Sequence, residues 1–485
     1  MNGILMFLAI VLSIAIMVFA PSLSVHYEAG FGTIPPVTVG DCARALVFCY
    51  VLAAVAGFLI RRIPTHGSYL FKLFAFALLL RIVIGTAILV LNGQDFFGGD
   101  AFTYDYYGYQ QVLAWGGDAN ARSIAEMYIG PGIGIGSAWG MVYAVAVIYG
   151  IIGRNLLAIQ FVNAVLGAAT APVIFMCAHE VFKNRRVAKL AALAVAFYPS
   201  LVLWSSQGLK DGPIIFSLAL CMLATLKLGQ KLSGAYIAVL VAGLLCILGL
   251  RFYVFYMIMA AIVGAFLIGM RAATAQSIVR QFVIFLVLGL SMTYLGVTRL
   301  ASSQFEQYGS LQELQRSRLD ATRSAETGFN KDVDVSTTSG ALSTIPKGLL
   351  YLLFAPFPWD VGSLRQNLTL PEMAIWWASF PLLVLGLWFS IKYRLRQMSP
   401  ILIFTSMLSV AYSVFQGNVG TAYRQRAQLL VFYFIFVAVG VILLKEKREE
   451  KARLAKRERL IGSQRRPAWA NREPKPQVVR ATLEG

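Results

Sequence analysis

Long apolar runs separated by short polar connections are the dominant pattern of this chain. A helix that crosses a bilayer needs about 20 largely apolar residues, because the hydrocarbon core is about 30 Å thick and a helix rises about 1.5 Å per residue. Runs of this kind lie at 3–21, 41–60, 69–91, 155–178, 188–206, 212–229, 234–250, 252–270, 278–297, 372–391, 399–416 and 427–444. The pattern predicts an all-α, polytopic membrane helix bundle with about twelve transmembrane helices.

Two other apolar stretches are poor candidates for spanning helices. The stretch 132–152 contains five glycines, which weaken a helix, and we expect it to lie along the outer surface as a juxtamembrane helix. The stretch 346–357 is too short to span and is expected to be an interfacial or re-entrant element.

The composition agrees with a membrane protein, since charged residues make up 13% of the chain and apolar residues 58%. An ordinary soluble protein has about a quarter of its residues charged. The formal net charge of +19 does not indicate nucleic-acid binding, because the basic residues gather in short loops and in the tail, where they orient a membrane protein.

Basic loops predict which parts of the chain face the cytoplasm. They are Arg61-Arg62, Lys183 to Arg186, Lys227 with Lys231, Arg271 with Arg280, Lys392 to Arg396, and the tail from Lys445. If all lie inside, both termini are cytoplasmic and the protein resides in the inner (plasma) membrane. The outer face, toward the periplasm or exterior, then comprises 22–40, 92–154, 205–212, the neighbourhood of Arg251, 298–371 and 416–428.

These patterns divide the chain into five regions. They are two N-terminal helices at 1–68, a core at 69–297 that includes the first outer loop 92–154, a large outer loop at 298–371, C-terminal transmembrane helices at 372–444, and a basic cytoplasmic tail at 445–485. The tail lacks apolar periodicity, so we expect it to be disordered or to lie on anionic membrane lipid.

The first outer loop carries the most conspicuous acidic residues. Gly98 and Gly99 allow a tight turn that presents Asp100 to a cavity, and Tyr104 would lie on the same helical face. An acid at the mouth of an apolar bundle can have its pKa raised into the range of a general base. Asp100 could equally cap a helix. Asp105 is the second candidate acid of this loop.

The other candidate residues are mostly basic and lie in the predicted outer turns. Lys210 could hold a phosphate with Asp211 orienting it, although snorkelling and capping also explain this pair. Arg424 and Arg426 lie on the side where positive charge is unusual, and their spacing suits a phosphate or pyrophosphate. Arg251 could join them or be structural.

The large outer loop offers a further candidate, Trp359, in a Pro-Phe-Pro-Trp-Asp run. A charged surface helix and a loop explain most of this region, but loops of this length are more often functional than idle.

Several function classes lack their signatures. The five cysteines fall in or beside apolar runs without metal-ligand spacing, which predicts neither disulfides nor a zinc site. There is no Walker or dinucleotide motif. Apart from Arg81, the spanning runs lack the midplane charges of a proton-coupled carrier. We expect no cofactor, while a divalent cation remains open.

The order of motifs between residues 69 and 230 is the most specific feature. An outer-loop Gly-Asp followed by Tyr precedes a helix that ends in His179-Glu180-Val181-Phe182-Lys183-Asn184-Arg185-Arg186, and Tyr198-Pro199-Ser200, Trp204 and Leu209-Lys210-Asp211 follow. This order resembles the multi-pass GT-C glycosyltransferases, especially bacterial members similar to protein mannosyltransferases and aminoarabinose transferases.

The resemblance implies transfer of a sugar from a polyprenyl phosphate or pyrophosphate carrier to a glycan, lipid or protein acceptor on the outer face, with inversion. By position, Asp100 would act as the base, and Lys210, Arg424 and Arg426 would stabilise the leaving phosphate. The family commonly has a second acid beside the first. Here the next residue is Ala101, and the two additional N-terminal helices also depart from the simplest family layout.

Other readings remain open at this point. A polysaccharide polymerase or an O-antigen ligase-like enzyme would use arginines of the large loop instead of Asp100. A flippase or other transport component would need polar residues lining the bundle, and a non-catalytic component of a polysaccharide assembly system would tolerate loss of Asp100.

Overall fold

The computed structural model of the chain describes residues 2–464 with short gaps. The gaps are residues 25–26, 30–31, 35, 92, 131–138, 269–273, 298, 301–303, 305–308, 324–327, 330–332 and 360–363. The described part is helical apart from one small antiparallel pair of strands, β1 (Tyr27–Ala29) and β2 (Gly32–Ile34). The expectation of a helical, polytopic bundle is confirmed.

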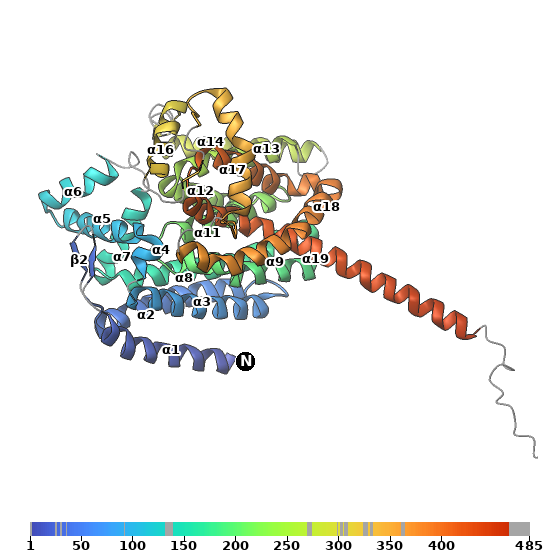
Figure 1. The fold of residues 1–485 in the computed structure, drawn as a ribbon, viewed down its shortest axis with the longest axis horizontal. Helices are drawn as coiled ribbons and strands as arrows, with labels where there is room; N and C mark the ends of the chain where they lie inside the picture. Colours follow the sequence, from blue (N-terminus) through green and yellow to red (C-terminus); the bar gives the residue numbers. More distant parts are fainter. Residues whose placement is uncertain are drawn as a thin grey trace, which may run out of the picture.

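A long buried helix forms the centre of the N-terminal half. The long helices here are α1 (Asn2–Leu23), α2 (Val39–Arg61), α3 (Gly67–Val90) and the central α8 (Leu156–Phe182). Both α2 and α3 pack against α8, and α8 is buried along nearly its whole length. In Figure 1 these helices run side by side, with α1 on the outside of the layer.

Four short helices between α3 and α8 gather at one end of the bundle (Figure 1). They are α4 (Gln94–Gly98), α5 (Asp100–Trp115), α6 (Ala119–Ile129) and α7 (Trp139–Ile152). With 14 residues, α7 is about 21 Å long, too short to cross the hydrocarbon core. This length agrees with the expected juxtamembrane helix, of which residues 132–138 lie outside the described residues.

The chain after α8 continues with helices that pack on it and on one another. They are α9 (Arg185–Phe197), α10 (Pro199–Ser205), α11 (Asp211–Leu228), α12 (Gly234–Leu250), α13 (Phe252–Ile268) and α14 (Ala275–Tyr294). The axes of α9 and α10 differ by 54°. The bend lies at Pro199, because the residue before a proline is driven out of the helical conformation, as the extended backbone of Tyr198 shows.

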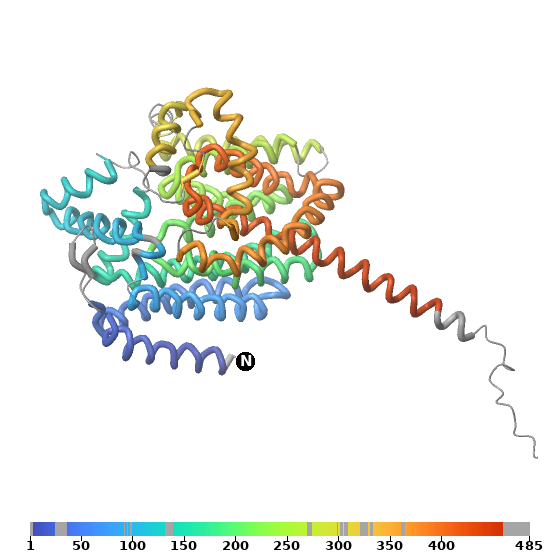
Figure 2. The backbone as a smooth tube through the Cα atoms, viewed as in Figure 1, coloured from blue at the N-terminus to red at the C-terminus, as the bar shows by residue number. Residues whose placement is uncertain are grey.

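The last part of the chain contains two very long helices. The elements are α16 (Leu311–Arg323), α17 (Thr338–Phe354), α18 (Leu364–Phe415) and α19 (Val419–Gln464). The helical dihedral angles of α18 are interrupted at Arg394 (φ −135°, ψ 17°), so it consists of two helices joined at a kink. The path of the chain in Figure 2 shows α18 and α19 lying alongside each other, as their close packing requires.

Eight helices among the described residues are long and apolar enough to cross a membrane, or nine if α9 and α10 form one bent span. The expected number was about twelve. Two expected spans, α12 and α13, have only 17 residues each, and the two expected near 372–391 and 399–416 are joined in α18. The number twelve therefore stays a prediction.

The tail differs from the sequence-based expectation. Instead of ending at Leu444, α19 continues without a break to Gln464. Acidic and basic residues four apart, such as Lys445 with Glu449 and Glu449 with Arg453, support an exposed helix. Residues 465–485 lie outside the described residues.

The five cysteines differ in their exposure. Cys42, Cys49, Cys177 and Cys221 are free and buried, whereas Cys246 is free and exposed. It lies on α12, an apolar helix, where an outward-facing thiol can contact lipid.

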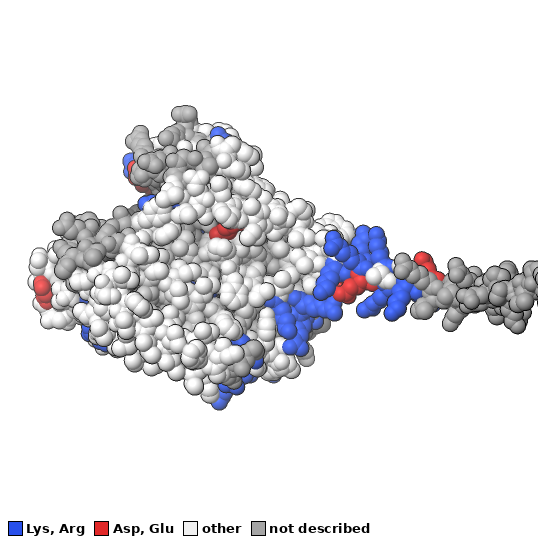
Figure 3. All heavy atoms as spheres, turned by 60° about the horizontal axis from the view of Figure 1, so that its bottom comes forward, with Lys and Arg blue, Asp and Glu red and all other residues white. Residues whose placement is uncertain are grey.

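The predicted cytoplasmic loops come together at one end of the bundle. Glu180 pairs with both Lys183 and Lys227, and Arg186 lies 3.5 Å from Glu449 of the tail. In Figure 3, Lys and Arg side chains crowd the place where α19 leaves the bundle. These loops, predicted separately from the sequence, therefore share one end of the molecule.

Candidate active site

Asp100 is the first residue of α5 and its side chain is 53% exposed. The N-cap of α5 is Gly99, which makes no side-chain cap hydrogen bond, so Asp100 is not the capping residue that the sequence allowed. Its carboxylate instead accepts a hydrogen bond from Arg424 Nη1 at 2.7 Å. The acid is thus held in place and still accessible.

The turn between α10 and α11 presents Lys210 and Asp211. Asn163 of α8 fixes this turn by donating to the carbonyl oxygens of Gln207 and Leu209, at 2.6 and 2.7 Å. Asp211 then begins α11 fully buried. A buried carboxylate needs charged partners, and Asp211 has two arginines.

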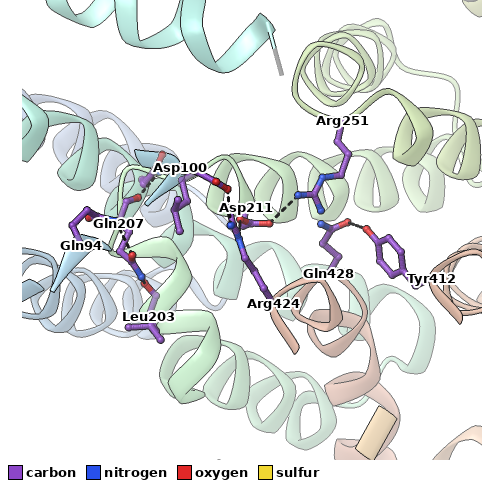
Figure 4. A network of polar contacts seen from close by, with 11 residues as sticks. Gln94, Asp100, Leu203, Gln207, Asp211, Arg251, Tyr412, Arg424 and Gln428 are labelled. Carbon is purple, nitrogen blue, oxygen red and sulfur yellow. Dashed lines mark hydrogen bonds and ion pairs between the residues drawn. The ribbon is translucent and has the colours of Figure 1, made fainter. Parts of the chain in front are cut away.

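Arg424 joins the two acids of the site. Its Nε donates to Asp211 Oδ2 at 2.6 Å while its Nη1 donates to Asp100. On the other side of Asp211, Arg251 Nη2 approaches Oδ1 at 3.5 Å. Figure 4 shows Arg424 reaching up between the two carboxylates with Arg251 across from it.

Two guanidinium nitrogen atoms in this cluster are buried without a hydrogen-bond partner among the described residues. They are Arg251 Nη1 and Arg424 Nη2. A buried N–H group without a partner costs free energy, more so when it is charged. Unused donors on two arginines beside a lysine are typical of a place that receives an anion.

Lys210 is electrostatically coupled to the same residues. Burial, together with the nearby Arg251, lowers the pKa of Lys210 to about 7, although Asp211 and Asp100 oppose the shift. Lys210 can therefore gain or lose a proton near neutral pH according to what binds beside it.

A buried chain of carboxamides lies beside the site, as Figure 4 partly shows. Gln160 of α8 donates to Gln94 of α4 at 3.0 Å, and Gln94 donates to Gln207 at 2.9 Å. This chain connects α4, which leads into Asp100, to the turn that carries Lys210. The sequence contained a signal for it, since Gln160 and Asn163 are polar residues in an otherwise apolar run.

Two glycines let the supporting helices approach the turn closely. A Cβ atom on Gly85 would lie 2.5 Å from the carbonyl oxygen of Ser206, and one on Gly167 would lie 2.4 Å from Ser205. Arg81 is buried here and donates to Ser205 Oγ at 2.8 Å and to the Ala196 carbonyl at 2.9 Å. Arg81 is therefore a structural residue of this packing.

Tyr104 lies beneath Asp100 and is 2% exposed. Burial and the nearby Asp100 raise the pKa of Tyr104 well above its usual range. Its hydroxyl interacts with that of Tyr128 on α6. Tyr104 therefore stays neutral and links Asp100 to the outer helices.

Asp105 does not join the cluster. Its carboxylate is 2% exposed, accepts a hydrogen bond from Tyr149 Oη at 2.5 Å and is paired with Arg154 at 2.5 Å. With both oxygen atoms engaged, Asp105 ties α5 to α7 and to the start of α8. The second candidate acid therefore lies apart from Asp100, among structural contacts of its own.

Arg426 and Trp359 also lie outside the cluster. Arg426 is fully buried and donates to the carbonyl oxygens of Leu353 and Ala355 at 3.1 and 3.0 Å, so it caps the end of α17. Trp359 is 82% exposed and stacks on Phe357. Neither residue contacts the Asp100–Arg424 pair.

A cavity of about 750 Å³ opens beside the cluster, with Gly99 and Arg424 in its lining. Apolar and polar side chains share its lining. The apolar ones include Leu80, Ile84, Phe96, Phe97, Phe197, Pro199, Val202, Leu203 and Trp204, and the polar ones are Arg365, Gln366, Thr369, Glu372, Asn418, Thr421, Tyr423 and Arg424. The cavity suits a ligand with a long apolar part and a polar end.

Glu372 and Arg365 are further charged residues of the cavity lining. Glu372 is 5% exposed and accepts a hydrogen bond from Tyr423 Oη at 2.7 Å, while the Arg365 guanidinium lies over the Phe96 ring. Both precede or begin an apolar run, so nothing in the local pattern distinguished them.

No group of three or more His, Cys, Asp or Glu side chains that could hold a metal ion occurs in the described part of the chain. The two acids nearest each other in the site, Asp100 and Asp211, share Arg424.

Part of the chain matches a known family. Residues 138–296 match the family model described as dolichyl-phosphate-mannose-protein mannosyltransferase. The resemblance to GT-C membrane glycosyltransferases that the motifs predicted is confirmed by this match. No curated protein matches the chain.

Two solved structures are similar in fold at low identity. One is the apo oligosaccharyltransferase of Archaeoglobus fulgidus, with 15% identity and a TM-score of 0.43 over 79% of this chain and 52% of that one. The other is AglB from the same organism in complex with an inhibitory peptide and a dolichol-phosphate, with 15% identity, a TM-score of 0.43, and coverage of 79% and 51%. The chain spans about half the length of these proteins.

Proposed function

We propose that this protein is a membrane glycosyltransferase that transfers a sugar from a polyprenyl-phosphate-type lipid donor to a glycan, lipid or protein acceptor on the outer face of the membrane. The observation that carries the proposal is the convergence of Asp100, Lys210, Asp211, Arg251 and Arg424 at the edge of a largely apolar cavity. They come from four separate places in the chain, and only folding brings them together.

The charges suit a lipid phosphate. Arg251 and Arg424 each have a buried nitrogen atom that has no hydrogen-bond partner among the described residues. Lys210 adds a third cation. Guanidinium groups bind phosphate oxygen atoms through paired hydrogen bonds. The apolar side chains that line the adjoining cavity are suitable for contact with the first prenyl units of the donor.

The reaction needs a base and a stabilised leaving group. Asp100 takes the proton of an acceptor hydroxyl, whose oxygen then forms a bond to the anomeric carbon of the sugar. The bond from that carbon to the phosphate oxygen breaks, and the electron pair leaves with the lipid phosphate. Attack from the face opposite the phosphate inverts the anomeric configuration. Lys210, Arg251 and Arg424 stabilise the phosphate charge that develops, which is an efficient use of fixed cations.

The location follows from the two ends of the bundle. Asp211 begins α11 and Lys227 lies in its last turn, so the candidate site and the basic end are about 24 Å apart along this helix. With the basic loops in the cytoplasm, the site faces the exterior or periplasm.

Donor binding can be tested first. The purified chain is incubated with polyprenyl phosphate and polyprenyl-phosphate sugars and examined by native mass spectrometry, beside the double variant Lys210→Ala, Arg424→Ala. Retention by the wild type and loss by the double variant is the expected result. The variant Arg396→Ala, an exposed arginine in the kink of α18 at the other end of the bundle, is the control and should bind normally.

Turnover distinguishes the proposal from the main alternative. Asp100→Asn should bind donor and stay folded but lose transfer by about 10²-fold or more, because a positioned general base contributes 10²–10⁴. A polymerase or ligase that relies on arginines of the region 298–371 would instead lose activity in a variant such as Arg316→Ala, whose exposed side chain lies outside the cavity lining. Normal turnover by Asp100→Asn would remove the proposed base.

A further inference from the structure

A second charged cluster lies at the basic end of the bundle, far from the candidate active site. Glu180 in the last turn of α8 is 8% exposed. Its carboxylate accepts hydrogen bonds from Lys183, Lys227 and Gln230. Two chain segments, the end of α8 and the end of α11 with the turn after it, are therefore fastened together around one buried acid.

Beside Glu180 is a separate cavity of about 120 Å³. Its lining includes Glu180, Lys183, Gln230, Arg394 and Gln397. The first three come from α8 and from the connection after α11, and the last two come from the kink of α18. The cavity is thus enclosed between segments that are distant in sequence, and most of its lining side chains are polar.

The cations here outnumber the acid. Lys183 and Lys227 both pair with Glu180, and Arg394 adds a positive charge that makes no ion pair with any described residue. Lys183 also has a left-handed backbone (φ 52°, ψ 18°) at the C-cap of α8, a position where glycine is usual. In this conformation the amino group of Lys183 reaches Glu180.

We infer that this cavity binds the phosphate of an anionic membrane phospholipid. The site lies at the ends of helices long enough to span a bilayer, which is the depth of lipid headgroups. Basic pockets between membrane helices on the cytoplasmic side are suited to anionic headgroups. Arg394 supplies the unpaired charge, and the amide groups of Gln230 and Gln397 provide further polar contacts. This inference does not depend on the proposed function.

The test measures lipid binding instead of activity. The full chain is delipidated in detergent and titrated by native mass spectrometry with dioleoyl phosphatidylglycerol and, separately, with dioleoyl phosphatidylcholine, which has the same acyl chains but no net charge. The wild type should bind one phosphatidylglycerol in clear preference. Arg394→Gln should weaken that binding about fivefold, the effect of one cation near a charged lipid surface, and Arg394→Lys should largely restore it.

The control is Arg396→Gln, two residues away, exposed and outside the cavity lining. It removes the same charge and should leave the bound lipid in place. Equal weakening by both glutamine variants would show that the surface charge as a whole attracts lipid and would overturn the site. An absence of preference for phosphatidylglycerol would also overturn it. Inorganic phosphate that occupies the cavity as tightly as the lipid would assign it to a soluble anion.

Discussion

At the scale of single residues, the guanidinium of Arg424 organises the candidate site. It contacts Asp100 and Asp211 at 2.7 and 2.6 Å and lies 5.8 Å from the Trp204 ring. Its side chain is 17% exposed and that of Asp211 is 1% exposed, so the Arg424–Asp211 pair is shielded from water and stronger than at a surface. The Asp100 end of the bridge stays open to solvent.

Lys210 should make donor binding dependent on pH. Its pKa is about 7 in the empty site, because burial disfavours the charged form, and a bound phosphate raises that pKa again. Lys210 carries its charge below pH 7 and loses it as the pH rises through 7. Donor affinity should therefore fall by up to about tenfold per pH unit above 7, with proton uptake on binding, measurable by calorimetry in buffers of different ionisation enthalpy.

The control for this prediction is Lys210→Arg, which stays charged over the whole range and should give a flat profile. A wild-type affinity that is constant between pH 6 and 9 would contradict the assignment of Lys210 to the phosphate. The effect on folding has the opposite direction: the folded chain binds fewer protons than the unfolded chain between about pH 7 and 10, so stability rises with pH in this window.

Asp105 should matter for stability and not for chemistry. Asp105→Ala leaves Arg154 without its carboxylate and Tyr149 without its acceptor. Loss of one partner from a fully buried ion pair lowers the free energy of unfolding by about 3–5 kcal/mol. The loss is smaller for this pair, because the Arg154 side chain is 29% exposed. A lowered thermal transition with donor binding intact in the folded fraction is expected. Unchanged melting would show that the pair contributes nothing.

Charged residues in outer turns could be chosen from the sequence because charge is conspicuous beside apolar runs. Asp100, Lys210, Asp211, Arg251 and Arg424 were found in this way. Sequence could not show which charges had structural partners. Arg154 is 49 residues from Asp105, and the carbonyl groups that hold Arg426 are more than 70 residues away.

At the scale of the secondary-structure elements, close backbone approach fixes the site. The turn that carries Lys210 and Asp211 lies directly against α3 at Gly85 and is hydrogen-bonded to α8 through Asn163. Apolar periodicity located these helices, but it carries no information about where their backbones touch.

Gly85→Ala should push the turn away from α3. The added Cβ would lie 2.5 Å from the Ser206 carbonyl oxygen, and overpacking of this kind costs roughly 1–3 kcal/mol. We expect a lower thermal transition and weaker donor binding together. Gly289→Ala on α14 is the matched control, since nothing lies within 4 Å of its Cβ, and it should be neutral or slightly stabilising. Equal melting of both variants would contradict the close approach.

The helix boundaries show a second limit of sequence reasoning. The apolar run ends at Leu444, yet α19 continues to Gln464, because pairs of opposite charges four residues apart can extend a helix beyond the membrane. A hydropathy pattern registers the end of burial and not the end of the helix.

At the scale of the whole molecule, acids and arginines of the candidate site occupy one end and the basic loops the other. Figure 1 shows the N-terminus directed to the same side as the projecting end of α19. The arrangement predicts that Trp359, 82% exposed, faces the exterior and Leu454, 52% exposed, faces the cytoplasm.

Cysteine labelling tests this orientation. Trp359→Cys should react with a membrane-impermeant maleimide in right-side-out vesicles, and Leu454→Cys only in inverted vesicles. The native background is low, because Cys246 is the one exposed cysteine and lies on an apolar helix. Labelling of both positions from the same side would contradict the topology.

The bridge from Arg424 to Asp100 also affects the order of events in a catalytic cycle. While Arg424 donates to Asp100, one oxygen atom of that carboxylate is engaged and is not free to receive the proton of an acceptor hydroxyl. A lipid phosphate that engages Arg424 competes for the same guanidinium and releases Asp100 to receive a proton. In kinetic terms the mechanism is sequential with a compulsory order, the lipid donor first and the acceptor second. Initial-rate measurements with a dead-end acceptor analogue should show uncompetitive inhibition against the donor, and an enzyme without donor should have little affinity for acceptor.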